Sequence, residues 1–161
     1  MLGIPESLAL SEDGLRERFY ALSKIVHPDR HTHSPPDEAR RALRWSALLN
    51  GAYRTLRDPA SRAWHLLERH GRAAARSTPP LDLAEQWFEI QEEDGAPGHG
   101  ARLETFLVEL RERLAACVRE RILLFGEAVS EGMLDRLHAS LVREKYLTSL
   151  IADVERKKGS L

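Results

Sequence analysis

The feature that most constrains this chain is an amphipathic helix that stops at His27-Pro28-Asp29, with a second long amphipathic helix after it. From Glu12 to about Val26, one helical face carries Leu15, Phe19, Leu22 and Val26 at i, i+4, i+7, i+11 spacing. Pro28 ends this helix because it lacks an amide hydrogen and disfavours helical geometry in the preceding residue. The next helix, from Pro36 or Asp37 to about Arg57, has an apolar face predicted to be buried: Ala42, Trp45, Leu48, Leu49, Ala52, Tyr53 and Leu56. We therefore expect a helical hairpin with a three-residue tip.

The rest of the chain is also predicted to be helical, which makes the fold class all-α. Asp58-Pro59 starts a third helix, which runs from Ala60 to His70 and ends at Gly71. Small residues and prolines between Ala73 and Pro80 indicate a domain boundary. Three further helices follow, at about 82–93, 102–125 and 130–156. The predicted organisation is a hairpin domain over residues 1–72, a linker over 73–80 and an antiparallel three-helix bundle over 81–161.

Composition excludes several classes of function. The chain has 161 residues, with 24 Lys and Arg against 25 Asp and Glu. This balance argues against nucleic-acid binding, which depends on an excess of cationic groups. No apolar run is long enough for a membrane span, and residues 1–6 have no signal-peptide pattern, so a cytoplasmic protein is expected. Cys117 is the only cysteine, so it forms no internal disulfide, and it is predicted to pack as a small hydrophobe. We expect no cofactor.

The face of the first helix beside the tip is expected to be exposed, because Arg16, Tyr20 and Lys24 lie on it at i, i+4, i+8 spacing. One interpretation of the tip itself is a metal site built from His27, His31, His33 and Asp29. Pro28 breaks the helix between these histidines, so they form no helical i, i+4 pair, and no cysteine assists. Solvated loop histidines are the more common case, and we predict no metal.

The hairpin resembles the J-domain of co-chaperones, in which a His-Pro-Asp tripeptide joins two long antiparallel helices. The resemblance implies that the tip binds a DnaK-class chaperone and triggers its ATP hydrolysis. In that role Asp29 would pair with an arginine of the chaperone, Pro28 would hold the turn, and His27 would contribute hydrogen bonding and packing. The implied chaperone-binding residues are Arg16, Tyr20, Lys24, His27, Pro28, Asp29 and Arg30.

The resemblance narrows to the HscB family when the remaining motifs are included. They are Leu2-Gly3-Ile4-Pro5, the segment 46–56 (SALLNGAYRTL), Pro59-Ala60-Ser61-Arg62-Ala63 and Glu85-Gln86. HscB proteins deliver an IscU-like iron–sulfur scaffold protein to the HscA chaperone, so the same role is implied here. The implied scaffold-binding residues are Leu83, Ala84, Trp87, Phe88, Gln91 and Tyr146. The plainer interpretation of Leu83, Trp87 and Tyr146 is bundle core. Because Trp87 and Phe88 are adjacent, a narrow helical stripe cannot bury both, and the exposed one is expected to anchor a partner.

The chain departs from the family pattern in two places. J-domains of this family begin with a short helix that carries an aromatic pair. Because this chain starts at Met1-Leu2-Gly3, either that helix is absent, which should loosen the base of the hairpin, or the given start of the chain is late. Phe88 and Gln91 stand where acidic residues align, which weakens the case for scaffold affinity.

Other functions stay open at this point. One is a general J-domain protein that serves other clients. Another is a helical regulatory or nucleic-acid-binding protein that uses Arg40, Arg41, Arg44, Arg54 and Arg57. A helical hydrolase or metal enzyme is the least favoured, because no phosphate-binding loop, nucleophile elbow or metalloprotease motif is present, and we expect a non-enzymatic protein.

Overall fold

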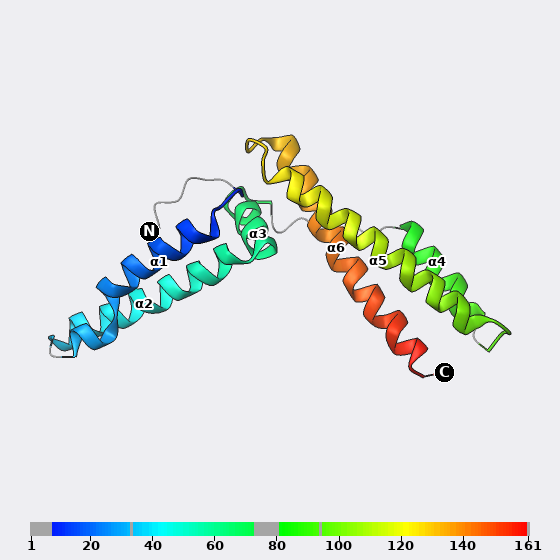
Figure 1. Ribbon diagram of the computed structural model, residues 1–161, viewed down its shortest axis with the longest axis horizontal. Coiled ribbons are helices and arrows are strands. Elements are labelled where there is room, and N and C mark those ends of the chain that lie inside the picture. Colours follow the sequence, from blue (N-terminus) through cyan, green and yellow to red (C-terminus); the bar gives the residue numbers. More distant parts are fainter. Residues whose placement is uncertain (1–7, 33, 73–80, 94, 161) are drawn as a thin grey trace. The chain divides into compact units, whose positions relative to one another are not determined.

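The computed structural model describes residues 8–32, 34–72, 81–93 and 95–160, and these residues form helices with no strand. The helices are α1 (Glu12–Val26), the short 3-10 helix η1 (Pro28–His31), α2 (Pro36–Arg57), α3 (Pro59–Arg69), α4 (Leu81–Glu92), α5 (His99–Leu124) and α6 (Glu131–Lys158) (Figure 1). The predicted all-α class is confirmed. None of the described helices is long and apolar enough to cross a membrane.

The chain divides into two compact units, Met1–Gly71 and Arg72–Leu161. We refer to them as the hairpin unit and the bundle unit. Residues 73–80, predicted to be a linker, lie outside the described residues, and so does the start of the chain, where the leading helix was expected to be missing.

The helices of the hairpin unit begin where short polar side chains and prolines predict. The Ser11 hydroxyl accepts the Gly14 amide at the start of α1, at 3.2 Å, and the Asp58 carboxylate accepts the Ser61 amide at the start of α3, at 2.6 Å. Pro36 and Pro59 occupy first-turn positions, where no amide hydrogen is needed. The strongest local signals therefore set the helix boundaries.

The α1–α2 core is small. Leu15 and Leu49 are buried, and six partly buried side chains pack against them: Phe19, Leu22, Val26, Ala52, Tyr53 and Leu56. The prediction that Trp45 and Leu48 are buried is wrong, because each is 50% exposed. The apolar stripe of α2 is wider than the face that α1 covers, so the residues at its edge stay in solvent.

A buried arginine closes the base of the hairpin. Arg62 on α3 donates from Nε to the Leu56 carbonyl at 2.8 Å and from one terminal nitrogen to the Leu8 carbonyl at 2.6 Å. Leu8 is itself buried. Burial lowers the pKa of Arg62, while the charges of Glu12 and Asp58 act in the opposite direction. Arg62 therefore ties the segment before α1 to the end of α2.

The bundle unit has a longer core along α4, α5 and α6. One core cluster there consists of Leu83, Ile90, Leu103, Phe106, Leu107, Leu110, Cys117, Leu147, Leu150 and Val154, and Leu124, Met133, Leu134, Leu137 and Leu141 are buried as well. Cys117 is buried as predicted, and its thiol donates to the Ser140 carbonyl at 3.1 Å. Arg121 and Glu144 form an ion pair between α5 and α6. Long facing helices thus bury a continuous apolar seam.

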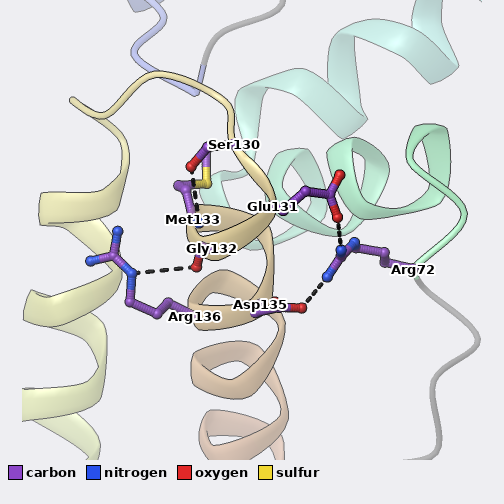
Figure 2. A network of polar contacts seen from close by, with 7 residues as sticks. All are labelled: Arg72, Ser130, Glu131, Gly132, Met133, Asp135 and Arg136. Atoms are coloured by element: carbon purple, nitrogen blue, oxygen red, sulfur yellow. Dashed lines mark hydrogen bonds and ion pairs between the residues drawn. The ribbon is translucent and has the colours of Figure 1, made fainter.

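Polar contacts hold the start of α6 (Figure 2). The Ser130 hydroxyl caps the helix by accepting the Met133 amide at 3.2 Å. Arg72, the first residue of the bundle unit, donates to Glu131 and to Asp135 on α6. Acidic side chains in the first turns also suit the positive end of the helix dipole.

Candidate functional site

The tip of the hairpin is a tight turn organised by His27. His27 is the residue before η1, and its Nδ1 accepts the Asp29 backbone amide at 3.3 Å. Pro28 is the first residue of η1, where its missing amide hydrogen costs nothing. Since Nδ1 acts as the acceptor, the ring proton lies on Nε2. All three residues of the tripeptide thus have separate parts in the turn.

The residues after the tripeptide fold back onto the end of α1. Arg30 donates to the Lys24 carbonyl at 2.8 Å, and His31 Nε2 is hydrogen-bonded to the Ile25 carbonyl at 3.3 Å. These carbonyls lie in the last turn of a helix, where no further helical amide is available to them. The Thr32 hydroxyl also donates to the Asp29 carbonyl at 3.2 Å. Local hydrogen bonds therefore hold the tip in shape without burial.

The Asp29 carboxylate points into solvent, with 85% of its side chain exposed. Its Oδ2 lies 3.6 Å from His27 Nδ1, but that nitrogen already accepts a hydrogen bond from the Asp29 backbone amide. Within the described part of the chain, no lysine or arginine pairs with this carboxylate. A cationic group of a partner can therefore reach it directly.

A surface depression of about 410 Å³ lies beside the tip, lined by Tyr20, Ser23, Lys24, His27 and Arg30. Tyr20 is 58% exposed, and its ring lies tilted against Phe19. Four of the predicted residues thus meet here. Arg16 is on the same face of α1 but outside this depression, in an ion pair with Asp13 at 2.6 Å. Ser23 was not predicted, although it lies three residues after Tyr20 and so shares its helical face.

The metal alternative finds no support in the histidines of the tip. His31 Nε2 is engaged with the Ile25 carbonyl, and His33 lies outside the described residues. Among the residues that the structure does describe, no group of three His, Cys, Asp or Glu side chains could hold a metal ion.

The predicted scaffold-binding residues fall into two groups. Leu83 is 1% exposed and belongs to the bundle core, while Trp87 and Tyr146 pack against that core from its edge. The Trp87 ring stacks on Phe106, with 6.3 Å between centroids. Burial raises the pKa of Tyr146, and the neighbouring Asp82 charge raises it further. Ala84 is half-buried, and Phe88 and Gln91 are exposed.

An exposed stripe follows α4 at i, i+3, i+7, i+10 spacing and consists of Leu81, Ala84, Phe88 and Gln91, which we call the outer α4 stripe. Phe88 is 65% exposed and Leu81 is 69% exposed. Leu81 was not among the predicted scaffold-binding residues, although its helical spacing from Phe88 places the two residues on the same face of α4. Exposed glutamates at 85, 89 and 92 lie on the same helix. The surface is therefore apolar with acidic neighbours.

Comparison with known proteins gives a consistent set of relatives. No protein-family model matches the chain. The co-chaperone protein HscB homolog of Azoarcus sp. (strain BH72) is 38% identical over 70% of this chain and 67% of its own length. The homolog of Burkholderia multivorans is 30% identical over 95% of this chain and 91% of its own length.

Solved structures agree with these relatives. The chaperone HscB from Vibrio cholerae matches with a TM-score of 0.64 and 26% identity, covering 99% of this chain and 95% of that one. Human co-chaperone HscB matches with a TM-score of 0.58 at 20% identity, covering 99% and 81% respectively, and supports the fold alone.

Proposed function

The chain belongs to the HscB family of co-chaperones, and on that basis we propose that its tip stimulates the ATPase of a DnaK/HscA-class chaperone while its bundle delivers an IscU-like iron–sulfur scaffold protein. The family works with a DnaK-type chaperone in iron–sulfur cluster biogenesis. The protein catalyses no reaction of its own in this proposal, and the cytoplasmic location expected from the sequence stays a prediction.

The observation that carries the chaperone role is the exposed Asp29 carboxylate beside the depression at the tip. A carboxylate without an internal cation can form a charge-assisted hydrogen bond with an arginine of the chaperone. The turn is already held by the His27 and Arg30 hydrogen bonds, so little ordering is needed when the chaperone binds.

The depression beside the negatively charged Asp29 is lined by positively charged side chains. Lys24 and Arg30 lie on its lining, next to the half-exposed ring of Tyr20. Opposite charges in close proximity favour a partner surface that carries both an arginine and acidic groups, and they orient it during approach. In this proposal Tyr20 supplies the apolar contact area, since aromatic side chains are common interface anchors.

The scaffold role rests on the outer α4 stripe. Phe88 presents an aromatic ring to solvent although a neighbouring position on the same helix, Trp87, packs against the core. An exposed large apolar group with acidic neighbours suits a partner surface that is apolar and rimmed by basic side chains. We assign direct scaffold contact to Phe88, Ala84 and Gln91, and a supporting position to Leu83, Trp87 and Tyr146.

The decisive experiment replaces Asp29 with asparagine, which preserves size and removes the charge. We expect Asp29→Asn to lower stimulation of a DnaK-class chaperone's ATPase by about tenfold or more, since a charge-assisted contact is lost. Folding should be unchanged because the side chain is exposed. Steady-state ATP hydrolysis by the chaperone, measured over a range of co-chaperone concentrations, reports the effect.

Asp37→Asn is the matched control. Asp37 is an exposed aspartate in the first turn of α2, paired with Arg40. This variant should stimulate the chaperone as well as the native protein does. Full stimulation by Asp29→Asn would overturn the proposed chaperone role.

A further inference from the structure

One side of α2 presents large apolar side chains to solvent. Trp45 and Leu48 lie three residues apart on this side, and each is 50% exposed. The exposed residues one helical turn before them are Arg41 and Arg44. We call these four residues the α2 face. Neighbouring apolar side chains that stay in solvent and are rimmed by charge are typical of an interaction surface.

The charge of the α2 face is positive. From Ala39 to the end of α2 the chain has five arginines and no acidic residue, because the acids of this helix are confined to its first turn. Arg41 donates from Nε to the backbone carbonyl of Asp37, at 3.3 Å, and that contact neutralises no charge. Arg44 has no ion pair with any residue that the structure describes. Both guanidinium charges can therefore attract an acidic surface.

The outer α4 stripe has the opposite charge. Helix α4 has four acidic residues and no lysine, arginine or histidine. Glu85 lies one turn from Leu81 and one turn from Phe88, on the exposed side of the helix. Glu92 lies one turn after Phe88. Both carboxylates are exposed, and neither pairs with another residue in the described part of the chain.

The α2 face and the outer α4 stripe complement each other in shape as well as in charge. Leu81 and Phe88 are seven residues apart, which separates them by roughly 10 Å along the helix. Between them on the stripe lies Ala84, whose methyl group leaves room for a larger side chain such as Trp45. Opposite charges around two apolar surfaces attract and orient them. Since one chain carries both surfaces, a second copy supplies a matching partner for each.

We propose that the α2 face of one copy docks on the outer α4 stripe of a second copy. In this contact the two arginines lie against Glu85 and Glu92, and the apolar side chains pack between these charges. A contact between single helix faces is small, so the association is weak and is populated only at high protein concentration. Docking also covers Phe88, to which the proposed function assigns scaffold contact. The second copy and the scaffold therefore compete, and this competition, unlike the self-association, rests on the proposed function.

Sedimentation velocity of the purified full-length chain measures the association directly. The protein concentration is raised in steps to about 1 mM, which detects affinities as weak as millimolar. We expect the average mass to rise above that of the monomer as concentration increases. Added salt should reduce the rise, because exposed charges that face each other are screened. A monomer at every concentration would overturn the proposal.

A charge reversal locates the contact on α2. Arg44→Glu should weaken self-association about tenfold, because like charges then face each other. Arg54→Glu makes the same change in net charge at an exposed position of the same helix. Arg54 is nine residues from Trp45, so it lies on the opposite side of α2, and this control should associate like the native chain. Equal effects of the two variants would show that net charge alone matters and that the α2 face is not the contact.

A charge swap tests whether the α2 face meets α4. Glu85→Arg should also weaken self-association about tenfold when it is measured alone. In a mixture, Arg44→Glu puts a carboxylate on α2 and Glu85→Arg puts a guanidinium on α4, so the two proteins should associate with each other more strongly than either does with itself. Far-UV circular dichroism and the melting temperature check that each variant is folded. A mixture that associates no better than the separate variants would contradict the proposed pairing.

Addition of the purified IscU-like scaffold protein from the same organism tests the competition. An excess of scaffold should replace the self-associated species with complexes that contain one co-chaperone chain. If the chain self-associates but does not bind the scaffold, the self-docking stands and the proposed scaffold role is wrong. If the scaffold binds and the chain is monomeric throughout, the scaffold role stands and the self-docking is wrong. Scaffold binding that leaves self-association unchanged would exclude a shared site on α4.

Discussion

The cluster between α1 and α2 has two buried members, Leu15 and Leu49, whereas one cluster along α4, α5 and α6 of the bundle unit has ten. The hairpin also leaves Tyr20, Ile25, Leu43, Trp45 and Leu48 at least half exposed. A pair of helices can cover only one face of each, but three helices can enclose a seam. Among the described residues the bundle unit also leaves five large apolar side chains at least half exposed, so the two units differ in the size of these core clusters and not in how many apolar side chains they present.

The two units also hold their candidate sites differently. At the tip, hydrogen bonds from His27 and Arg30 to nearby backbone groups set the geometry. On α4, the exposed Phe88 is positioned because its neighbour Trp87 packs on Phe106. The tip therefore depends on local bonds, and the α4 site depends on the core beneath it.

The largest expected effect comes from shortening one core leucine in each unit. Leu110 is 0% exposed, so Leu110→Ala should destabilise the bundle unit by about 3 kcal/mol through lost burial and a residual cavity. Leu22 is only partly buried, and Leu22→Ala should cost the hairpin unit about 1 kcal/mol. Amide hydrogen exchange, read separately over α5 and α1, measures both. If the two variants lost the same free energy of unfolding, the contrast between the two cores would be contradicted.

A smaller effect is expected at the base of the hairpin. Arg62→Ala removes the hydrogen bonds to the Leu8 and Leu56 carbonyls, and the hairpin unit should lose about 2 kcal/mol. Arg57→Ala removes an exposed arginine at the end of α2 and serves as the control. Hydrogen exchange at the start of α1 is the readout. If the amides at the start of α1 exchange at the same rate in both variants, Arg62 does not hold the base of the hairpin.

The smallest effect is a pH dependence in the bundle unit. The hydrogen bond from Lys158 lowers the pKa of Glu104 from its ordinary value of 4.5, and the Lys158 charge acts in the same direction. A carboxylate with a lowered native pKa adds stability above its unfolded pKa, and this contribution is lost as pH falls through the native value. Glu104→Gln should therefore be slightly less stable than the native chain at pH 7 and match it in strong acid.

Urea unfolding of both proteins between pH 7 and pH 3 measures this difference. Glu112→Gln, at an exposed position on the same helix, should show no such convergence. A Glu104→Gln deficit that stays constant across the range would exclude the ion pair as its cause.

Much of the tip could be predicted from the sequence. Tyr20, Lys24, His27 and Arg30 were expected to act together, and all four line one depression. Helical spacing and a proline stop are local features, so they place these residues correctly. The hydrogen bonds of Arg30 and His31 to α1 carbonyls were not foreseen, because they depend on how the chain turns back after Pro28.

The α4 site was predictable only in part. Adjacency showed that Trp87 and Phe88 could not both be buried, but it did not show which would be exposed. The position of α5 decides this, since Phe106 receives the Trp87 ring. For the same reason Leu83, expected as a contact residue, lies in the core with 1% exposure.

By itself, the sequence determined the order of the α-helices in the described part of the chain, the stop at Pro28 and the composition of the tip. These depend on caps, prolines and apolar periods within a few residues of each position. Only the tertiary structure decided that Trp45 and Leu48 stay exposed and that Arg62 is buried. Those outcomes depend on how much of each helix its neighbours cover, and that coverage depends on residues far apart in the chain.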